Sequence, residues 1–373
     1  MTAPPRVVCA PNAFKGSLTA AEAASAMSEG VTQAGGEPVL LPVADGGDGT
    51  LDVLLSDAAP RARVSRVAVT GPLGEPVAAR LGHIDRTAVV ELAEASGLRL
   101  ISGRLHPMRA TSRGLGELIA AALDEEPERI LVGVGGSACT DGGAGMLQAL
   151  GARLLDGDGR EIGAGGGALR RLARIDMGEM HPALEHVRID VASDVRNPLL
   201  GPNGAAYVFA PQKGATAEDV QRLEEGLARL AAVAERDSAS GRYASLPGAG
   251  AAGGCGFALA LIGAHLYPGA ALVCDVIGLD ALLHGAALVL TGEGQLDQQT
   301  ASGKAPAEVA TRAARAGLRC VAIAGEVIDP MGSLFTGAIS LVEIAGELDP
   351  FLHAHALVRG AAYRAVELFL PRR

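Results

Sequence analysis

The stretch from Arg129 to Leu155 reads RILVGVGGSACTDGGAGMLQALGARLL and carries the pattern from which we infer the fold. It begins with an apolar run, Ile130 to Val134, whose β-branched content is typical of a buried strand. A glycine-rich segment (residues 133–145) follows. Met146, Leu147 and Leu150 then show helical spacing. A strand that ends in glycines before a helix favours anion binding, because bare backbone N–H groups and the helix dipole both attract negative charge.

We therefore expect the glycine-rich segment to hold a chain of phosphates. Thr140 or Asp141 is the expected N-cap of the following helix. The residues expected to contact the phosphates are Gly135, Gly136, Ser137, Thr140, Asp141 and Gly142.

The composition indicates a globular protein and excludes several classes of partner. The chain has 373 residues, of which 49% are hydrophobic, enough for two domains with large cores. Its net charge of −10 argues against a nucleic-acid surface. The five cysteines form no CxxC pair, and the N-terminus lacks a signal-peptide pattern, so a cytoplasmic location is expected. No apolar run is long enough to span a membrane, and the sequence leaves a homodimer open.

Lysine is rare in this chain, so each lysine is a candidate for a functional site. Only three of the 32 basic residues are lysines: Lys15, Lys213 and Lys304. A lysine that persists in so arginine-rich a chain is a candidate for a site that needs a compact ammonium group, for example beside a phosphate. Lys15 and Lys304 are the stronger candidates, and chance survival on the surface is the alternative.

Polar loops follow several of the expected strands. The N-terminal part reads as a strand (6–10), a helix from Thr19 with a capping box to Glu22, and a second strand (37–43). Later strands are expected at 187–193, 286–290 and 320–324. Because ligands bind at the carboxyl ends of strands in open α/β sheets, the polar side chains that follow the strands are site candidates. These are Asn12, Lys15, Ser17, Asp45, Asp48, Asp194, Asn197, Glu293, Asp297 and Lys304, with Arg113 at the start of a further helix.

The two ends of the chain show the same alternation of strands and helices, and the middle differs. We predict an α/β protein of two domains. A Rossmann-like doubly wound domain is formed by residues 1–74 and 286–373, and an α/β domain of residues 75–285 is inserted into it. The site is expected in the cleft between them.

Two stretches of the sequence partly match familiar nucleotide-binding motifs. The SGK at 302–304 is not a P-loop, because the spacing from Gly294 is too long and Ala305 replaces the metal-binding hydroxyl. Residues 133–138 fit G-x-G-x-x-A after a strand, which keeps an NAD-dependent oxidoreductase of a small hydroxy acid as an alternative. Against that alternative, extra glycines delay the helix and leave it short.

Five motifs in order along the chain resemble the bacterial type I glycerate kinases. They are PNAFKGSLTAAEAA, ADGGDGT, GGSACTDGGAGMLQALGA, SDVRNPLLGPNGAAYVFAPQKGA and LTGEGQLDQQTASGKAP. The resemblance implies a two-domain α/β enzyme that uses ATP and Mg²⁺ to phosphorylate D-glycerate, usually at the 2-hydroxyl to give 2-phosphoglycerate. A non-catalytic metabolite-binding regulator is the remaining alternative.

Phosphoryl transfer depends mainly on charge neutralisation and alignment, and we assign expected roles on that basis. Asp194, Lys15 and Asp45 are expected to be catalytic, with Asp194 as the base for the glycerate hydroxyl. Asn12, Ser17, Asp48, Arg113 and Asn197 are expected to bind substrate. Glu293 and Lys304 join the glycine-rich segment in binding ATP. The expected metal ligands are one or two of Asp45, Asp194, Glu293 and Asp297.

Overall fold

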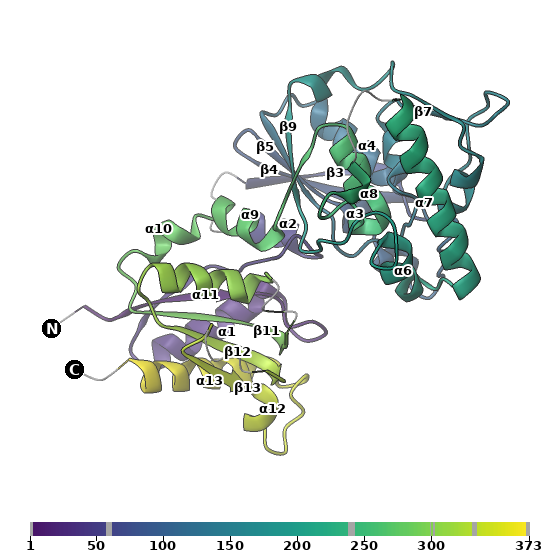
Figure 1. The fold of residues 1–373 in the computed structure, drawn as a ribbon. Coiled ribbons are helices and arrows are strands. Elements are labelled where there is room, and N and C mark those ends of the chain that lie inside the picture. Colours follow the sequence, from purple (N-terminus) through teal and green to yellow (C-terminus); the bar gives the residue numbers. More distant parts are fainter. Residues whose placement is uncertain are drawn as a thin grey trace. The chain divides into compact units, whose positions relative to one another are not determined.

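The computed structural model describes residues 3–56, 62–237, 243–298, 300, 303–329 and 334–370. The chain forms two compact units. Unit 1 comprises Met1–Asp45, Asp52–Ala59 and Pro268–Arg373, and unit 2 comprises Gly46–Leu51 and Pro60–Tyr267. Both ends of the chain therefore build unit 1, as predicted, and the middle builds unit 2 (Figure 1).

Unit 1 contains a five-stranded sheet in the order β13-β12-β11-β1-β2, and every neighbouring pair is parallel. Its strands are β1 (Arg6–Pro11), β2 (Glu37–Leu40), β11 (Leu288–Leu296), β12 (Cys320–Val327) and β13 (Gly337–Ser340). The sheet is therefore made of strands from both ends of the sequence, with β1 beside β11.

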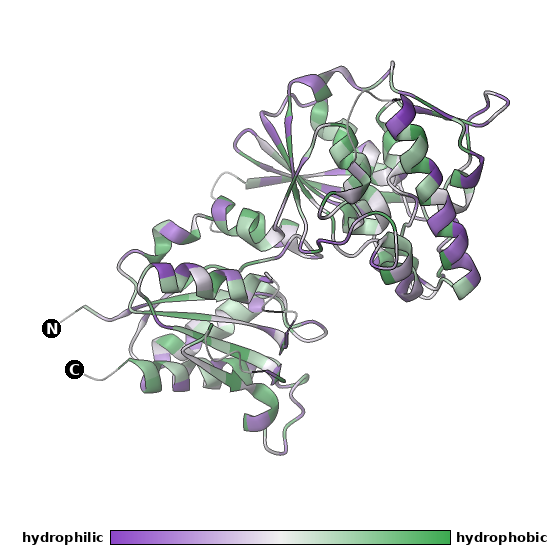
Figure 2. Ribbon diagram, viewed as in Figure 1, coloured by the Kyte–Doolittle hydropathy of each residue, from purple (hydrophilic) through white to green (hydrophobic). Residues whose placement is uncertain are grey.

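Helices cover both faces of this sheet, so its central strands are apolar on both sides. Val7 and Cys9 pack with α1 (Ala20–Gln33), α12 (Leu341–Ile344) and α13 (Ala354–Phe369). Val8 and Ala10 pack on the opposite face with α9 (Gly269–Val276), α10 (Leu279–Leu283) and α11 (Ala305–Arg315). Figure 2 shows the apolar strands between these helices. The predicted capping box of α1 is confirmed: Glu22 N donates to Thr19 Oγ1, and Thr19 N donates to Glu22 Oε2.

Unit 2 contains a six-stranded mixed sheet in the order β10-β9-β6-β5-β4-β3. The strands β5, β6, β9 and β10 are parallel, and β3 and β4 form an antiparallel hairpin. The bounds are β3 (Ala62–Thr70), β4 (Pro76–Ile84), β5 (Thr87–Glu91), β6 (Arg129–Gly133), β9 (Arg188–Ala192) and β10 (His265–Tyr267). A separate antiparallel pair consists of β7 (Arg153–Leu155) and β8 (Arg174–Asp176).

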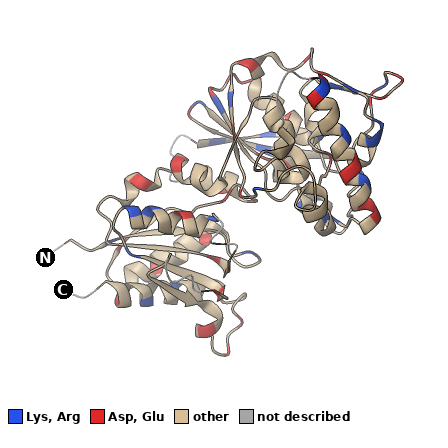
Figure 3. Ribbon diagram, viewed as in Figure 1, with Lys and Arg blue, Asp and Glu red and all other residues tan. Residues whose placement is uncertain are grey.

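The helices of unit 2 share one large core with this sheet. They are α3 (Leu92–Ser96), α4 (Arg113–Leu123), α5 (Ala144–Ala149), α6 (Ala205–Phe209), α7 (Ala217–Asp237) and α8 (Ala251–Leu261), with short 3₁₀ helices at Leu98–Ile101, Gly166–Arg171, Pro182–Glu185, Pro211–Lys213 and Tyr243–Ser245. The long helix α7 buries an apolar stripe and carries charges of both signs on its outer side (Figure 3). The short helix α2 (Thr50–Leu54) contains the boundary between the units, which falls between Leu51 and Asp52.

The structure corrects several predicted boundaries. The hairpin β3–β4 lies wholly in unit 2 because its strands pair along their full length, so the first domain does not extend to residue 74. Residues 268–285 belong to unit 1, because α9 and α10 pack on its sheet. The strand that begins at Leu288 continues to Leu296, since β12 pairs with it beyond the glycines. The strand expected at 37–43 ends at Leu40.

Among the described residues, no helix combines the length and apolar character that a membrane crossing requires.

Candidate active site

In unit 1 the predicted site residues gather where the strand order reverses. The chain moves from β1 to β2 on one side and from β11 to β12 and β13 on the other, so the switch point lies between β1 and β11. The carboxyl ends of strands at such a point are where open α/β sheets bind ligands. Asn12 directly follows β1 and donates its backbone N–H to the Gly292 carbonyl of β11 at 2.8 Å.

Asn12 links the first two polar loops. Its side-chain amide donates to Asp45 Oδ2 at 3.2 Å, and its Oδ1 accepts the backbone N–H of Ala13 at 2.8 Å. Asp45 is half-buried and ends the first segment of unit 1. The prediction that these loops converge at one sheet edge is therefore correct for Asn12 and Asp45.

Glu293 is the most buried carboxylate at this edge, at 6% exposure. Its Oε1 accepts the Thr300 hydroxyl at 2.6 Å, and its Oε2 lies 3.9 Å from Lys304 Nζ. Burial raises the pKa of Glu293, the Thr300 hydroxyl and Lys304 lower it, and the charges of Asp45 and Asp297 raise it further. Lys304 Nζ also lies 4.0 Å from Asp297 Oδ1, so one ammonium serves two carboxylates. Glu293 lies within β11, not in the loop where the sequence suggested it.

The other two predicted residues of unit 1 lie in the turn after β1. Lys15 is exposed, and its backbone passes close to β11: a Cβ on Gly294 would lie 3.3 Å from Lys15 N. Ser17 donates its hydroxyl to the Phe14 carbonyl at 3.1 Å and so closes the turn that presents Lys15.

The donor set of this edge fits a magnesium ion. Asp45, Glu293 and Asp297 supply the hard carboxylate oxygens that Mg²⁺ prefers. Their mutual repulsion is only partly offset by Lys304, and a cation would favour the ionised form of the buried Glu293. Three of the four predicted metal ligands therefore gather in unit 1, and Asp194 belongs to unit 2.

In unit 2 the parallel strands β5, β6 and β9 end at a second polar edge. Glu91 ends β5 and is paired in register with Gly133 of β6, which in turn pairs with Ala192 of β9. The segment Gly46–Leu51 lies against these ends: Gly135 N donates to the Gly46 carbonyl at 3.0 Å. A Cβ on Gly46, where φ is +86°, would lie 2.5 Å from the Ala192 oxygen, so only glycine fits there.

The glycine-rich segment is shaped from inside by Asp141, which is fully buried. Its Oδ2 accepts Ser112 N at 2.8 Å and the Ser112 hydroxyl at 3.0 Å, and its Oδ1 accepts Gly143 N at 3.1 Å. The N-cap of α5 is Gly143, so the prediction of Thr140 or Asp141 at that position is wrong by two or three residues. Asp141 nevertheless satisfies backbone donors at the helix start, since it also accepts Gly145 N at 3.3 Å.

The rest of the glycine-rich segment is largely buried. Gly142 N donates to the Gly253 carbonyl at 3.0 Å, and Thr140 is fully buried. Gly136 is exposed, and its neighbours Gly135 and Ser137 are half-buried. The tip of the segment at 135–137 is therefore the part that a ligand can reach.

Lys213, which is 2% exposed, lies beneath this tip. Its Nζ donates to Ser137 Oγ at 2.9 Å and to the Cys139 carbonyl at 2.5 Å. Burial lowers the pKa of Lys213, and the nearby charge of Asp141 opposes that effect. Lys213 thus supports the segment from below rather than facing solvent.

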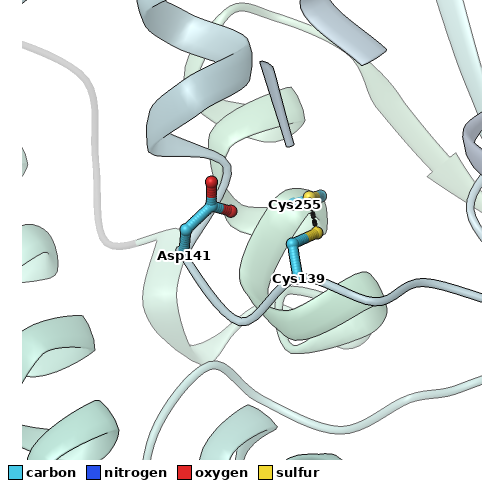
Figure 4. Close-up of side chains that lie close together, drawn as sticks. All are labelled: Cys139, Asp141 and Cys255. Atoms are coloured by element: carbon cyan, nitrogen blue, oxygen red, sulfur yellow. Dashed lines mark hydrogen bonds between the residues drawn. The ribbon is translucent and has the colours of Figure 1, made fainter. Parts of the chain in front are cut away.

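Two thiols lie beside the same segment. The sulfur atoms of Cys139 and Cys255 face each other at 3.9 Å, with Asp141 nearby (Figure 4). The hydrogen bond from Cys139, together with burial, raises the pKa of the Cys255 thiol. Because both Asp141 oxygens already accept hydrogen bonds, we assign the three side chains a packing role and no metal.

The remaining predicted residues of unit 2 are held by local contacts. Asp194 is half-buried and follows β9. Asn197 donates its side-chain amide to the Asn203 carbonyl at 2.8 Å, which closes the loop after Asp194. Arg113 pairs with Glu117 one turn along α4 at 3.0 Å. Asp48 is exposed, with Arg99 Nε at 3.4 Å from its Oδ1.

Glu91 and Arg99 lie at the polar edge of unit 2 and were not predicted from the sequence. Glu91 is the last residue of β5, and its carboxylate accepts hydrogen bonds from Gly49 N and Leu51 N. The available signal was its position directly after the apolar run Ala88–Val90.

The fold and the polar edges define a two-domain α/β protein with carboxylates and an ammonium at a sheet switch point, an arrangement suited to a phosphotransferase. The sequence profile described as "Glycerate kinase family" matches residues 7–369. The chain belongs to the glycerate kinase family, whose members are phosphotransferases.

Individual relatives agree over almost the whole length. The chain is 44% identical to "Glycerate kinase" of Bacillus subtilis (strain 168) over 366 residues, covering 94% of each protein. It is 43% identical to "Glycerate 2-kinase" of Escherichia coli (strain K12), covering 90% of this chain and 89% of the relative. A crystal structure provisionally described as glycerate kinase 2 of Salmonella typhimurium LT2 matches with a TM-score of 0.85 at 41% identity and covers 98% of each chain.

These matches decide between the alternatives left by the sequence. The oxidoreductase hypothesis is wrong, and α5 is indeed too short for a dinucleotide-binding helix, with only six residues. The regulator hypothesis is replaced by an enzyme of the kinase class.

Proposed function

We propose that this chain transfers the γ-phosphoryl group of ATP to the 2-hydroxyl of D-glycerate and releases 2-phosphoglycerate. The single observation that carries the proposal is the gathering of Asp45 and Asp297 near Glu293 at the switch point of unit 1, with Lys304 within 4.0 Å of both Glu293 and Asp297. The name of the E. coli relative, "Glycerate 2-kinase", supports the 2-hydroxyl as the acceptor.

Asp45, Glu293 and Asp297 would hold Mg²⁺, which neutralises phosphate charge during transfer. Glu293 is suited to this role because the Thr300 hydroxyl fixes one of its oxygens and leaves the other directed toward Lys304. Lys304 would bind a nucleotide phosphate as a point charge, and it occupies the N-cap of α11, where the helix dipole adds to its field.

The glycine-rich segment would contact phosphate through its accessible tip, Gly135, Gly136 and Ser137. Thr140, Asp141 and Gly142 are buried, so we assign them to shaping the segment, with Asp141 as the internal acceptor. Lys213 would add positive potential from beneath the tip, since its ammonium donates to Ser137.

D-glycerate offers a carboxylate and two hydroxyls. Lys15 would meet the carboxylate or the transferring phosphoryl group, because it is exposed on a turn fixed by Ser17. Asp194 would accept the proton of the 2-hydroxyl. Asn12, Asp48, Arg113 and Asn197 stay candidates for hydroxyl and carboxylate contacts.

The proposal is tested by measuring ADP release with and without D-glycerate in the presence of Mg²⁺. Enolase added to the product mixture then distinguishes the isomers, because it acts on 2-phosphoglycerate directly and on 3-phosphoglycerate only when a mutase is also present. We expect ADP release to require D-glycerate and enolase to consume the product without a mutase. A requirement for the mutase would move the acceptor to the 3-hydroxyl, and ADP release independent of glycerate would refute the substrate.

A further inference from the structure

Glu91 lies at the carboxyl edge of the unit 2 sheet and is 1% exposed. It ends β5 and faces Gly133 across the β5–β6 pair. The segment Gly46–Leu51, which continues directly from Asp45, passes over this edge. The buried carboxylate of Glu91 is therefore placed beneath the one stretch of unit 2 that follows a proposed metal ligand.

Both oxygens of Glu91 are used to hold that segment. Oε1 accepts the backbone N–H of Gly49 at 3.1 Å, and Oε2 accepts that of Leu51 at 2.8 Å. Only a carboxylate supplies two acceptors in this geometry, because a glutamine would turn an NH₂ group toward one of the two donors. A Cβ on Gly135 would lie 2.3 Å from Gly47 Cα, so the segment is also held by close backbone packing.

The charges around Glu91 make this an unusual anchor. The charged group that acts on Glu91 is Asp48, which carries the same sign, and burial together with Asp48 raises the pKa of Glu91 to about 7. Charges of alternating sign continue from Asp48. Arg99 forms ion pairs with both Asp48 and Glu94, and Glu94 also accepts a hydrogen bond from Arg80 at 2.9 Å. Burying a carboxylate beside another carboxylate is costly, so the group that holds this segment is one whose charge depends on pH.

We propose that Glu91 is a positioning residue for phosphoryl transfer, which fastens Gly46–Leu51 to the sheet and, through its proton, sets the position of Asp48. The proposal rests on the proposed function only in that Asp48 contacts the substrate. Protonation of Glu91 turns one of its oxygens into a donor toward Asp48, and the hydrogen bonds from the N–H groups of Gly49 and Leu51 lose the strength that an ionised acceptor gives them. The ionised form therefore holds the segment, and the neutral form loosens it.

The kinetic test compares the pH dependence of kcat/KM for D-glycerate in the wild type, Glu91→Gln and Asp48→Asn. We expect kcat/KM of the wild type to rise with pH, with the midpoint of this acid limb near pH 7. Glu91→Gln should lose this limb and fall by on the order of 10²-fold at higher pH, the scale of a misplaced contact. Asp48→Asn removes the like charge, so its limb should move to lower pH.

Asp237→Asn is the matched control. Asp237 also accepts a backbone N–H in unit 2, that of Ile175 at 2.9 Å, and it lies beside β8. This variant should keep the wild-type limb. If Glu91→Gln keeps the limb and only lowers kcat/KM uniformly, or if Asp48→Asn leaves the limb in place, the positioning role is refuted.

A substrate-free measurement separates this inference from the proposed function. Hydrogen exchange of the Gly49 and Leu51 amides, corrected for intrinsic rates, should show protection that weakens in the wild type as the pH falls through about 7. Protection should be low at every pH in Glu91→Gln and normal in Asp237→Asn. If the wild type does not phosphorylate D-glycerate, the substrate assignment fails while this exchange pattern still decides the role of Glu91. Protection that does not change with pH would refute that role.

Discussion

The Lys304 ammonium lies 3.9 Å from Glu293 Oε2, where the start of α11 meets the strand β11. The pair couples a proposed phosphate ligand to a proposed metal ligand. Burial raises the pKa of Glu293 and Lys304 opposes this shift, so the charge of Glu293 depends on Lys304.

Replacing Lys304 with methionine should therefore have two effects. The KM for ATP should rise by on the order of 10-fold, because a charge-assisted contact to phosphate is lost. The pKa of Glu293 should rise, since the cation that favours its ionised form is gone, and the acid limb of kcat should move to higher pH. Steady-state kinetics over pH measure both. Arg315→Ala, which removes an exposed cation at the other end of α11, should change neither, and an unshifted limb in Lys304→Met would contradict the coupling.

Asp194→Asn tests the proposed base. We expect kcat to fall by about 10² to 10⁴ with a modest change in KM, because general-base catalysis acts mainly on the chemical step. Asp158→Asn provides a control on an exposed carboxylate in the same unit, at 75% exposure. A nearly normal kcat in Asp194→Asn would assign the base to another carboxylate.

Glu91 should make stability depend on pH. Its pKa is raised from 4.5 to about 7 in the folded protein, so the folded state binds the proton more tightly. The stability that this tighter proton binding gives the folded state is fully present below the pKa of Glu91 in the unfolded chain, and it is lost as the pH rises through about 7. Relative to Glu91→Gln, the wild type should lose about 3 kcal/mol of unfolding free energy across this range. Urea unfolding of both proteins at several pH values measures the difference, and parallel pH curves would show that Glu91 titrates normally.

Asp141→Ala should destabilise unit 2. The change leaves the backbone donors of Ser112, Gly143 and Gly145 without their buried acceptor. We expect a loss of about 3 kcal/mol, the usual cost of removing a buried charged partner. Denaturant unfolding of this variant beside Asp158→Ala gives the value, and a loss as small as that of the exposed control would mean that the segment rearranges without strain.

The sequence predicted best what local chemistry determines. The capping box of Thr19 and Glu22 depends on a short sequence pattern, and the gathering of Asn12 and Asp45 at one edge follows from the rule that ligands bind at the carboxyl ends of parallel strands. The separate sheets and the kinase family are also confirmed. The assigned roles of Lys15, Asp194 and the metal ligands stay predictions.

What the sequence did not predict depends on partners distant in the chain. The strand β11 extends through its glycines because β12 pairs with it, and the helix α5 begins late because Asp141 turns inward to Ser112. The role of Glu91 was not predicted because its partners, Gly49 and Leu51, lie 42 and 40 residues away in the chain. The local periodicity of the sequence does not predict contacts between residues so distant in the chain.

The pairing of β1 with β11 also bears on the order in which the protein is assembled during synthesis. The Thr291 hydroxyl donates to the Ala10 carbonyl, a partner 281 residues earlier, so β1 emerges from the ribosome long before β11, one of its two neighbours in the sheet, exists. The last residue of unit 2, Tyr267, is made before β11, and that unit can complete its sheet first. Strand β1 therefore has β2 as its only sheet partner until β11 is made, and its open apolar edge needs protection from aggregation during that interval.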